Sequence, residues 1–249
     1  MPLTKMPWDY IAILVALAIV VPWRSSVRIQ TLLDSETLVP GERVALYAST
    51  MIFQWGISAI IFWRALAHGI TSAQLGLDVP NLKLALLIAI VLSAALITNQ
   101  VFGVKRLAGM PPENRGLIAR LAEKLLPRTR SERVVGVALV GTVGICEEFI
   151  YRGFIETIFQ NALASVIAGA VISAMFFAMA HIYQGRRGLV TTFIVGLIFS
   201  GVRVWTHSLM SSMIIHFFVD LSAAIAAAKL LLGARPSSEP VTGGNGDHP

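Results

Sequence analysis

The chain is short of charge, of cysteine and of the motifs that mark many soluble enzymes. Only 14% of its 249 residues are charged, whereas a soluble domain carries about 25%. A hydrophobic content of 55% and a mean hydropathy of +0.72 exclude a water-soluble enzyme and a disordered chain. The single cysteine, Cys146, cannot form an internal disulfide, which excludes a disulfide-stapled secreted module. There is no Walker loop, dinucleotide fingerprint, paired Cys-x-x-Cys or His-Glu-x-x-His.

In place of charge the sequence has apolar runs near the length of about 20 residues that crosses the hydrocarbon core of a bilayer. They predict an all-α polytopic membrane protein, a bundle of about seven (six to eight) transmembrane helices. The predicted spans are residues 8–23, 44–67, 82–104, 134–155, 163–183, 189–203 and 209–232. Residues 1–234 are expected to form one transmembrane domain, and residues 235–249, rich in Pro, Ser and Gly, a disordered tail.

The basic residues predict the orientation. Apart from Arg152, which is inside a span, fifteen Lys and Arg fall on one face and four on the other. The richer face should be cytoplasmic, so the N-terminus is expected outside and the C-terminus inside, in a bacterial cell membrane. This rule also accounts for the net charge of +6 without a nucleic-acid partner. Pro22-Trp23-Arg24 replaces the small residues of a signal-peptide cleavage site, so the first span is expected to be retained.

Residues 112–130 alternate apolar and charged side chains at helical spacing. This pattern fits an amphipathic helix on the cytoplasmic leaflet, and it fits equally an ordinary connector with a solvated face.

Charged residues interrupt the fourth predicted span. Three unpaired charges at the bilayer centre cost about 8–10 kcal/mol on insertion scales, so something must offset Glu147, Glu148 and Arg152. Glu148 and Arg152 stand four residues apart and can form an ion pair within one helix. Glu147 points about 100° away around the helix and lacks that partner. A carboxylate left in this way is suited to general-base catalysis, although a purely structural Glu–Arg pair would also explain Glu148.

Histidines follow on the next helices. His181 ends the fifth predicted span, a position where a single histidine is usually interfacial. His216 and Asp220 share one face of the last span at four-residue spacing. Because intramembrane ionisable groups face the bundle interior or a water-filled cavity, we expect these three side chains to converge with the glutamates.

Taken together, these ionisable residues resemble the motifs of a known protein family. Glu-Glu-x-x-x-Arg at 147–152, Phe-x-x-x-His at 177–181 and His-x-x-x-Asp at 216–220, in this order on three helices, look like the motifs of the CPBP family of intramembrane proteases, the CAAX-protease and bacteriocin-processing family. The resemblance covers about residues 134–232, and the Leu75-Gly76-Leu77 turn is also similar. Many relatives carry Asn in place of Asp220, and an Asp donates a hydrogen bond only when protonated.

The resemblance implies an endopeptidase for a membrane-associated peptide or protein. Glu147 with His181 would activate a water that attacks the scissile carbonyl, His216 and Asp220 would stabilise the oxyanion or hold the geometry, and Glu148 with Arg152 would give electrostatic support. No cofactor is expected. A zinc-dependent reaction remains an alternative, with His181, His216 and Glu147 as ligands.

Two alternatives fall outside protease chemistry. Buried Glu, His, Asp and Arg are also typical of proton relays and membrane transporters, although the chain lacks repeated halves. The other is a catalytically silent adaptor or immunity-type protein, as some members of the family are thought to be.

Simple alternation of straight spans leaves one geometric conflict. It puts His181 near the cytoplasmic end of its span, Glu147 about 20 Å from that face and His216 nearer the opposite face. A common site therefore requires offset helices, different boundaries or a cytoplasmic cavity that reaches into the bundle.

Overall fold

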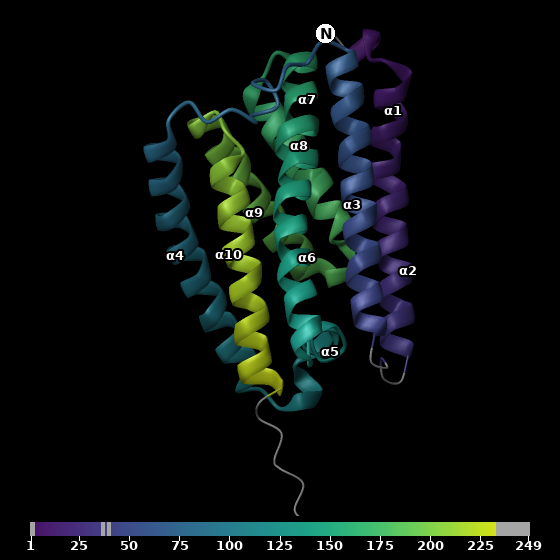
Figure 1. Ribbon diagram of the computed structural model, residues 1–249, viewed down its shortest axis with the longest axis vertical. Helices are drawn as coiled ribbons and strands as arrows, with labels where there is room; N and C mark the ends of the chain where they lie inside the picture. The colour runs from purple at the N-terminus through teal and green to yellow at the C-terminus, as the bar shows by residue number, and fades with distance from the viewer. Residues whose placement is uncertain (1–2, 36–37, 39–40, 233–249) are drawn as a thin grey trace, which may run out of the picture.

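The computed structural model describes residues 3–35, 38 and 41–232, and this part of the chain is helical without a strand (Figure 1). The predicted all-α fold is confirmed. The predicted tail lies outside the described residues.

The α-helices are α1 (Trp8–Val15), α2 (Val21–Asp34), α3 (Glu42–Ala67), α4 (Leu82–Ala108), α5 (Gly116–Leu125), α6 (Arg130–Glu148), α7 (Glu156–Leu163), α8 (Val166–Ala180), α9 (Gly185–Thr206) and α10 (Met210–Ala227). Three π-helical segments continue them: η2 (Ala16–Val20), η4 (Phe149–Ile155) and η6 (Ala228–Leu232). Short 3₁₀ turns are η1 (Leu3–Lys5), η3 (Pro112–Asn114) and η5 (Ile182–Gln184).

Within the described residues, six continuous helices are long and apolar enough to cross a membrane. They are Trp8–Asp34, Glu42–Ala67, Leu82–Ala108, Arg130–Leu163, Ile182–Thr206 and Met210–Leu231, and α8 is a shorter apolar helix among them. The predicted six to eight helices are confirmed, and the protein is an integral, multi-pass membrane protein. In Figure 1 the N-terminus lies at the upper end, and α10 runs down to the lower end.

Three predicted spans are clearly too short, and one of them is the sixth, predicted as residues 189–203 and observed as Ile182–Thr206. The first does not end near Trp23 but continues to Asp34, because the π-helical turns of η2 accommodate Pro22, which lacks an N–H, without breaking the helix. The fourth continues beyond Ile155 to Leu163, through the π-helix η4.

The helix α8 resolves the predicted conflict of depths. Ala164, with φ +50°, ends α7, and the Ser165 side chain accepts a hydrogen bond from the Ala168 amide to start α8. Fifteen residues extend only about 22 Å, less than the 30 Å or so of a hydrocarbon core. The chain therefore turns back inside the bundle, behind α6 in Figure 1, and His181 at the end of α8 lines the same cavity as Glu147 and His216.

A loop between α3 and α4 closes the upper end of the bundle. Leu75 is fully buried in the main core cluster, and the Leu209 amide donates to the Gly76 carbonyl at 2.7 Å. Gly76 has φ +75°, a conformation that favours glycine. The Leu75-Gly76-Leu77 turn is thus part of the packed bundle.

The predicted amphipathic segment forms a shorter helix, α5, at the lower end (Figure 1). Ala119 and Leu121 are buried, α5 packs against α2 and α10, and Arg120 and Glu123 are exposed. The Tyr47 hydroxyl donates to the Leu125 carbonyl. The apolar face of α5 is therefore covered at least partly by protein, which favours the connector over a helix lying free on the leaflet.

Candidate active site

Glu148 lies at the centre of a buried ionic network. Its side chain is fully buried, and its Oε1 accepts from Arg152 Nη1 at 2.9 Å and lies 2.9 Å from His216 Nδ1. The ion pair that the four-residue spacing predicts is therefore present. Because a carboxylate only accepts, His216 Nδ1 carries the proton in this contact. Glu148 thus connects the predicted motifs on α6 and α10.

Arg152 is also fully buried, and aromatic rings enclose it. Its Cζ lies 4.2 Å from the centroid of the Phe177 ring and 5.3 Å from that of Phe199, within the range of cation–π contacts. Its Nη2 donates to the Gly196 carbonyl at 3.3 Å. A Cβ at Gly196 would come within 3.0 Å of the Ala174 Cβ, so glycine lets α8 and α9 approach around the guanidinium. Arg152 thereby joins α6, α8 and α9 behind the cavity.

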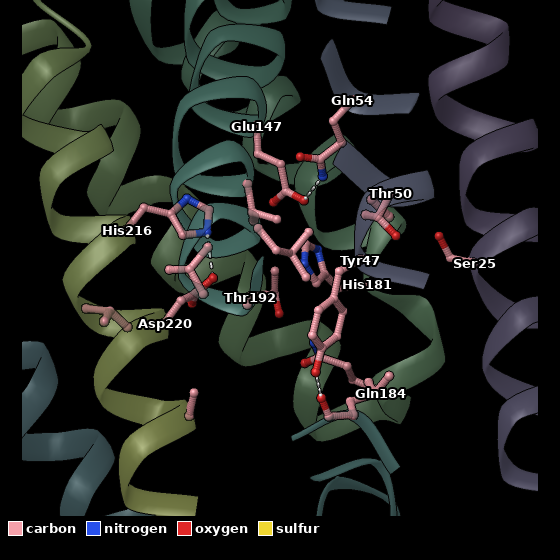
Figure 2. A pocket seen from close by; sticks show the side chains of 18 of the residues that line it. Ser25, Tyr47, Thr50, Gln54, Glu147, His181, Gln184, Thr192, His216 and Asp220 are labelled. Carbon is pink, nitrogen blue, oxygen red and sulfur yellow. Dashed lines mark hydrogen bonds and ion pairs between the residues drawn. The ribbon is translucent and has the colours of Figure 1, made fainter. Parts of the chain in front are cut away.

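Glu147 points away from this network, as predicted, but it is not alone. Its Oε1 accepts a hydrogen bond from Gln54 Nε2 at 3.0 Å, and Gln54 belongs to α3 (Figure 2). Its Oε2 is buried and accepts no hydrogen bond from the described residues. One oxygen of Glu147 is therefore held by Gln54, and the other has no hydrogen-bond donor among the described residues.

His216 presents its second nitrogen to Asp220. Nε2 lies 3.5 Å from Asp220 Oδ2, which is a long contact, and the Asp220 side chain is 40% exposed. A doubly protonated imidazole has donors at both nitrogens and matches the carboxylates on its two sides. Asp220 is therefore placed to accept from His216 and not to act as the amide donor that an Asn supplies.

His181 ends α8 in a defined orientation. Nδ1 lies 2.8 Å from the Phe177 carbonyl oxygen, and the two rings are packed edge to face with centroids 4.7 Å apart. Since a carbonyl only accepts, Nδ1 carries the proton, and Nε2 of the neutral ring has a free lone pair. Among the described residues no hydrogen bond joins His181 to Glu147.

The side chains meet at a cavity of about 910 Å³ between α2, α3, α6, α9 and α10. Four of the six predicted site residues line it, namely Glu147, His181, His216 and Asp220, and Figure 2 shows them around one space. Glu148 and Arg152 lie behind this wall. The cavity continues toward the lower end, where the arginines Arg24, Arg28 and Arg133 contribute to its lining.

The sequence prediction missed Gln54 and the contribution of α2 and α3 to the cavity. The signal for Gln54 is a polar amide within the predicted span 44–67, and an uncharged side chain stands out much less in an apolar span than a charged one. It also missed a second buried pair, Glu156 with Arg203, which lies outside this cavity.

The described residues do not bring a set of zinc ligands together. Among the described residues, no group of three or more His, Cys, Asp or Glu is placed to hold a metal ion. Glu147, His181 and His216 line the same cavity without forming such a group.

Part of the chain matches the model of a known protein family. Residues 129–222 match the family model described as type II CAAX prenyl endopeptidase Rce1-like. Over this segment the chain is similar to the Rce1-like family. The match runs from the start of α6 into α10, contains all six predicted site residues, and confirms the resemblance to CPBP proteases.

The match makes residues 129–222 similar to CAAX-type intramembrane proteases, and this segment is less than half of the chain. Comparisons with curated proteins and with solved structures give no significant match. The helices α1 to α4, including the one that carries Gln54, lie outside the matched segment.

Proposed function

We propose that the protein hydrolyses a peptide bond of a membrane-associated protein or peptide by using a water activated at Glu147. The observation that carries the proposal is that Glu147, whose Oε2 has no hydrogen-bond donor among the described residues, lines a cavity that His181, His216 and Asp220 also line. A buried carboxylate oxygen without a donor fits a water molecule, and two histidines border the same space. The Rce1-like match supports peptide-bond hydrolysis as the chemistry.

In the proposed reaction Glu147 takes a proton from water while the water oxygen bonds to the scissile carbonyl carbon. The carbonyl oxygen gains negative charge, and the Nε2–H of His216 is the donor proposed to stabilise it. His181, with a free lone pair at Nε2, assists the transfer of protons. The C–N bond then breaks, and the proton held by Glu147 passes to the leaving amine.

Glu148 and Arg152 act indirectly in this proposal. Glu148 holds Nδ1 of His216, which directs Nε2 toward Asp220 and the cavity, and Arg152 compensates the charge of Glu148. Such a fixed ring needs no reorientation as charge develops on the substrate.

The cavity suggests the route of the substrate. Its lining includes Arg24, Arg28 and Arg133 toward the lower end, which the excess of Lys and Arg predicts to be cytoplasmic, whereas the loop around Leu75 closes the upper end. We propose that a substrate segment enters from the lower face, and the name of the matched family makes a prenylated CAAX peptide the first substrate to test.

The decisive test is the pair Glu147→Gln and Glu123→Gln in purified protein in lipid vesicles. Prenylated and unprenylated CAAX peptides and a quenched peptide library serve as substrates, and products are identified by mass spectrometry. Glu147→Gln should lower turnover about 10²–10⁴-fold, the usual contribution of a general base, with an unchanged melting temperature. Glu123 is exposed on α5, so its variant should cleave like the parent. Equal turnover in parent and Glu147→Gln would refute the assignment.

The same preparation separates the proposal from transport and from a silent adaptor. A transporter or proton relay would give flux across sealed vesicles that depends on Glu147 without any cleaved product. An adaptor would give neither flux nor cleavage with any of the peptides. Cleavage that disappears in Glu147→Gln contradicts both.

A further inference from the structure

A polar contact joins α3 and α6 at the residue proposed as the general base. Gln54 donates from Nε2 to Glu147 Oε1 at 3.0 Å, and Gln54 Oε1 is buried with no partner among the described residues. The donor therefore comes from a helix outside the Rce1-like segment. We propose that Gln54 is a positioning residue of the hydrolytic reaction, which holds Oε1 of Glu147 so that Oε2 is the oxygen that takes the proton from water. This inference rests on the proposed function.

The geometry distinguishes the two oxygens of the carboxylate. Without the amide, the carboxylate of Glu147 could rotate about its last side-chain bond and direct its lone pairs elsewhere. The hydrogen bond to Gln54 opposes this rotation and so keeps the direction of Oε2 in a residue that lines the cavity. A hydrogen bond to a charged group contributes more than one between neutral groups, so this contact is strong enough to hold one orientation.

The amide suits both stages of the reaction. It is neutral at every working pH and donates to Oε1 whether Glu147 is ionised or has taken a proton, because a protonated carboxyl still has an accepting oxygen. The proton that leaves water therefore resides on Oε2, next to the substrate, and from there it passes to the amine when the C–N bond breaks. The reaction therefore consumes only water and the peptide.

A structural role for Gln54 makes a different prediction. If the amide served only to satisfy buried polar groups between α3 and α6, its removal would lower stability without a specific effect on kcat. A positioning role lowers kcat through the orientation of the reacting oxygen, because small misplacements of a catalytic group have large effects on rate. KM and the melting temperature should then change little.

The experiment compares Gln54→Met, which has a similar length and no donor, with Gln30→Met, the same substitution at an exposed position of α2. We expect Gln54→Met to lower kcat about 10–100-fold with KM within about threefold of the parent. Gln54→His, which keeps an N–H donor, should recover much of this loss. Gln30→Met should behave like the parent. If Gln54→Met cannot be purified folded, Gln54→Ala takes its place.

A double-mutant cycle shows whether Gln54 acts through Glu147. In the Glu147→Gln background, Gln54→Met should cause little further loss of residual turnover, since the residue that it positions is already inactive. A full additive loss, or a kcat unchanged in Gln54→Met, would overturn the inference. A parent enzyme that cleaves no peptide would instead refute the proposed function, and the two failures are therefore distinct.

Discussion

Two buried Glu–Arg pairs lie in the same bundle and differ in what surrounds them. Glu148 and Glu156 are both fully buried, two helical turns apart on the continuous helix from α6 to α7. Glu148 is 2.9 Å from Arg152 and shares its oxygen with His216 beside the large cavity. Glu156 is 3.9 Å from Arg203 and accepts from Gln160 Nε2 at 3.0 Å.

The pair of Glu156 with Arg203, here called the upper pair, helps to hold the loop between α3 and α4 in place. Arg203 Nη2 donates to the Gln74 carbonyl at 2.6 Å and to Thr157 Oγ1 at 3.0 Å, and Thr157 donates to the same carbonyl. No histidine hydrogen bonds to Glu156 among the described residues, whereas His216 binds Glu148. The comparison shows that a buried charge within a membrane span does not by itself mark catalysis. The additional signals at the Glu148–Arg152 pair are a histidine and a cavity of about 910 Å³ that Glu147, His181 and Asp220 also line.

The largest difference between the pairs should come from removing their arginines. Arg152→Ala leaves Glu148 without its compensating charge in a fully buried site, which costs about 3–5 kcal/mol of folding free energy. We expect little folded protein, measured by yield and by thermal melting in detergent.

The double variant Glu148→Gln/Arg152→Met is the control for this prediction. It should recover much of the yield and melting temperature, because the uncompensated charge is removed with its partner. Activity should remain low, because Gln holds His216 less firmly. An Arg152→Ala protein that melts like the parent while its turnover collapses would place Arg152 in the chemistry and contradict the ion-pair role.

Arg203→Met should have a smaller effect, about 1–3 kcal/mol, because Arg203 mainly bonds neutral oxygens and its pair with Glu156 is longer. A polar pocket of about 220 Å³ beside Arg203 gives water access to the groups that are released. Folded Arg203→Met should keep kcat within about threefold of the parent. A selective loss of kcat with unchanged melting would show that the upper pair also serves the reaction.

The packing of the loop between α3 and α4 can be tested with a substitution whose expected effect on stability is smaller still. Gly76→Ala introduces a side chain at φ +75°, where the strain costs about 1–2 kcal/mol, and the new Cβ would lie 3.3 Å from Leu209 Cγ. We expect a melting temperature a few degrees lower and unchanged kinetics at low temperature. Gly41→Ala is the control, since it has a similar φ but nothing within 4 Å of its Cβ. Equal melting of the two variants would show that the contact with Leu209 adds nothing to the strain.

Contacts within one helix could be predicted from the sequence, whereas contacts that depend on the arrangement of several helices could not. The Glu148–Arg152 pair and the shared face of His216 and Asp220 follow from helical spacing, and both are present. The depth of His181 could not be predicted, because it depends on how far α7 extends and on where α8 begins, and no charge marks that turn. The contact of Gln54 with Glu147 joins residues 93 positions apart, which no periodicity connects.

The smallest effect is expected from metal removal, because the structure uses the histidine nitrogens in other ways. A histidine binds a metal through a free lone pair on a ring nitrogen. In His216, Nδ1 donates to Glu148 and Nε2 faces Asp220, and in His181 only Nε2 is free. A membrane-permeant chelator should therefore change turnover less than about twofold, and elemental analysis should find no stoichiometric zinc. One zinc per chain that disappears in His181→Ala would contradict this prediction, since it would require His216 to leave a carboxylate in favour of the metal.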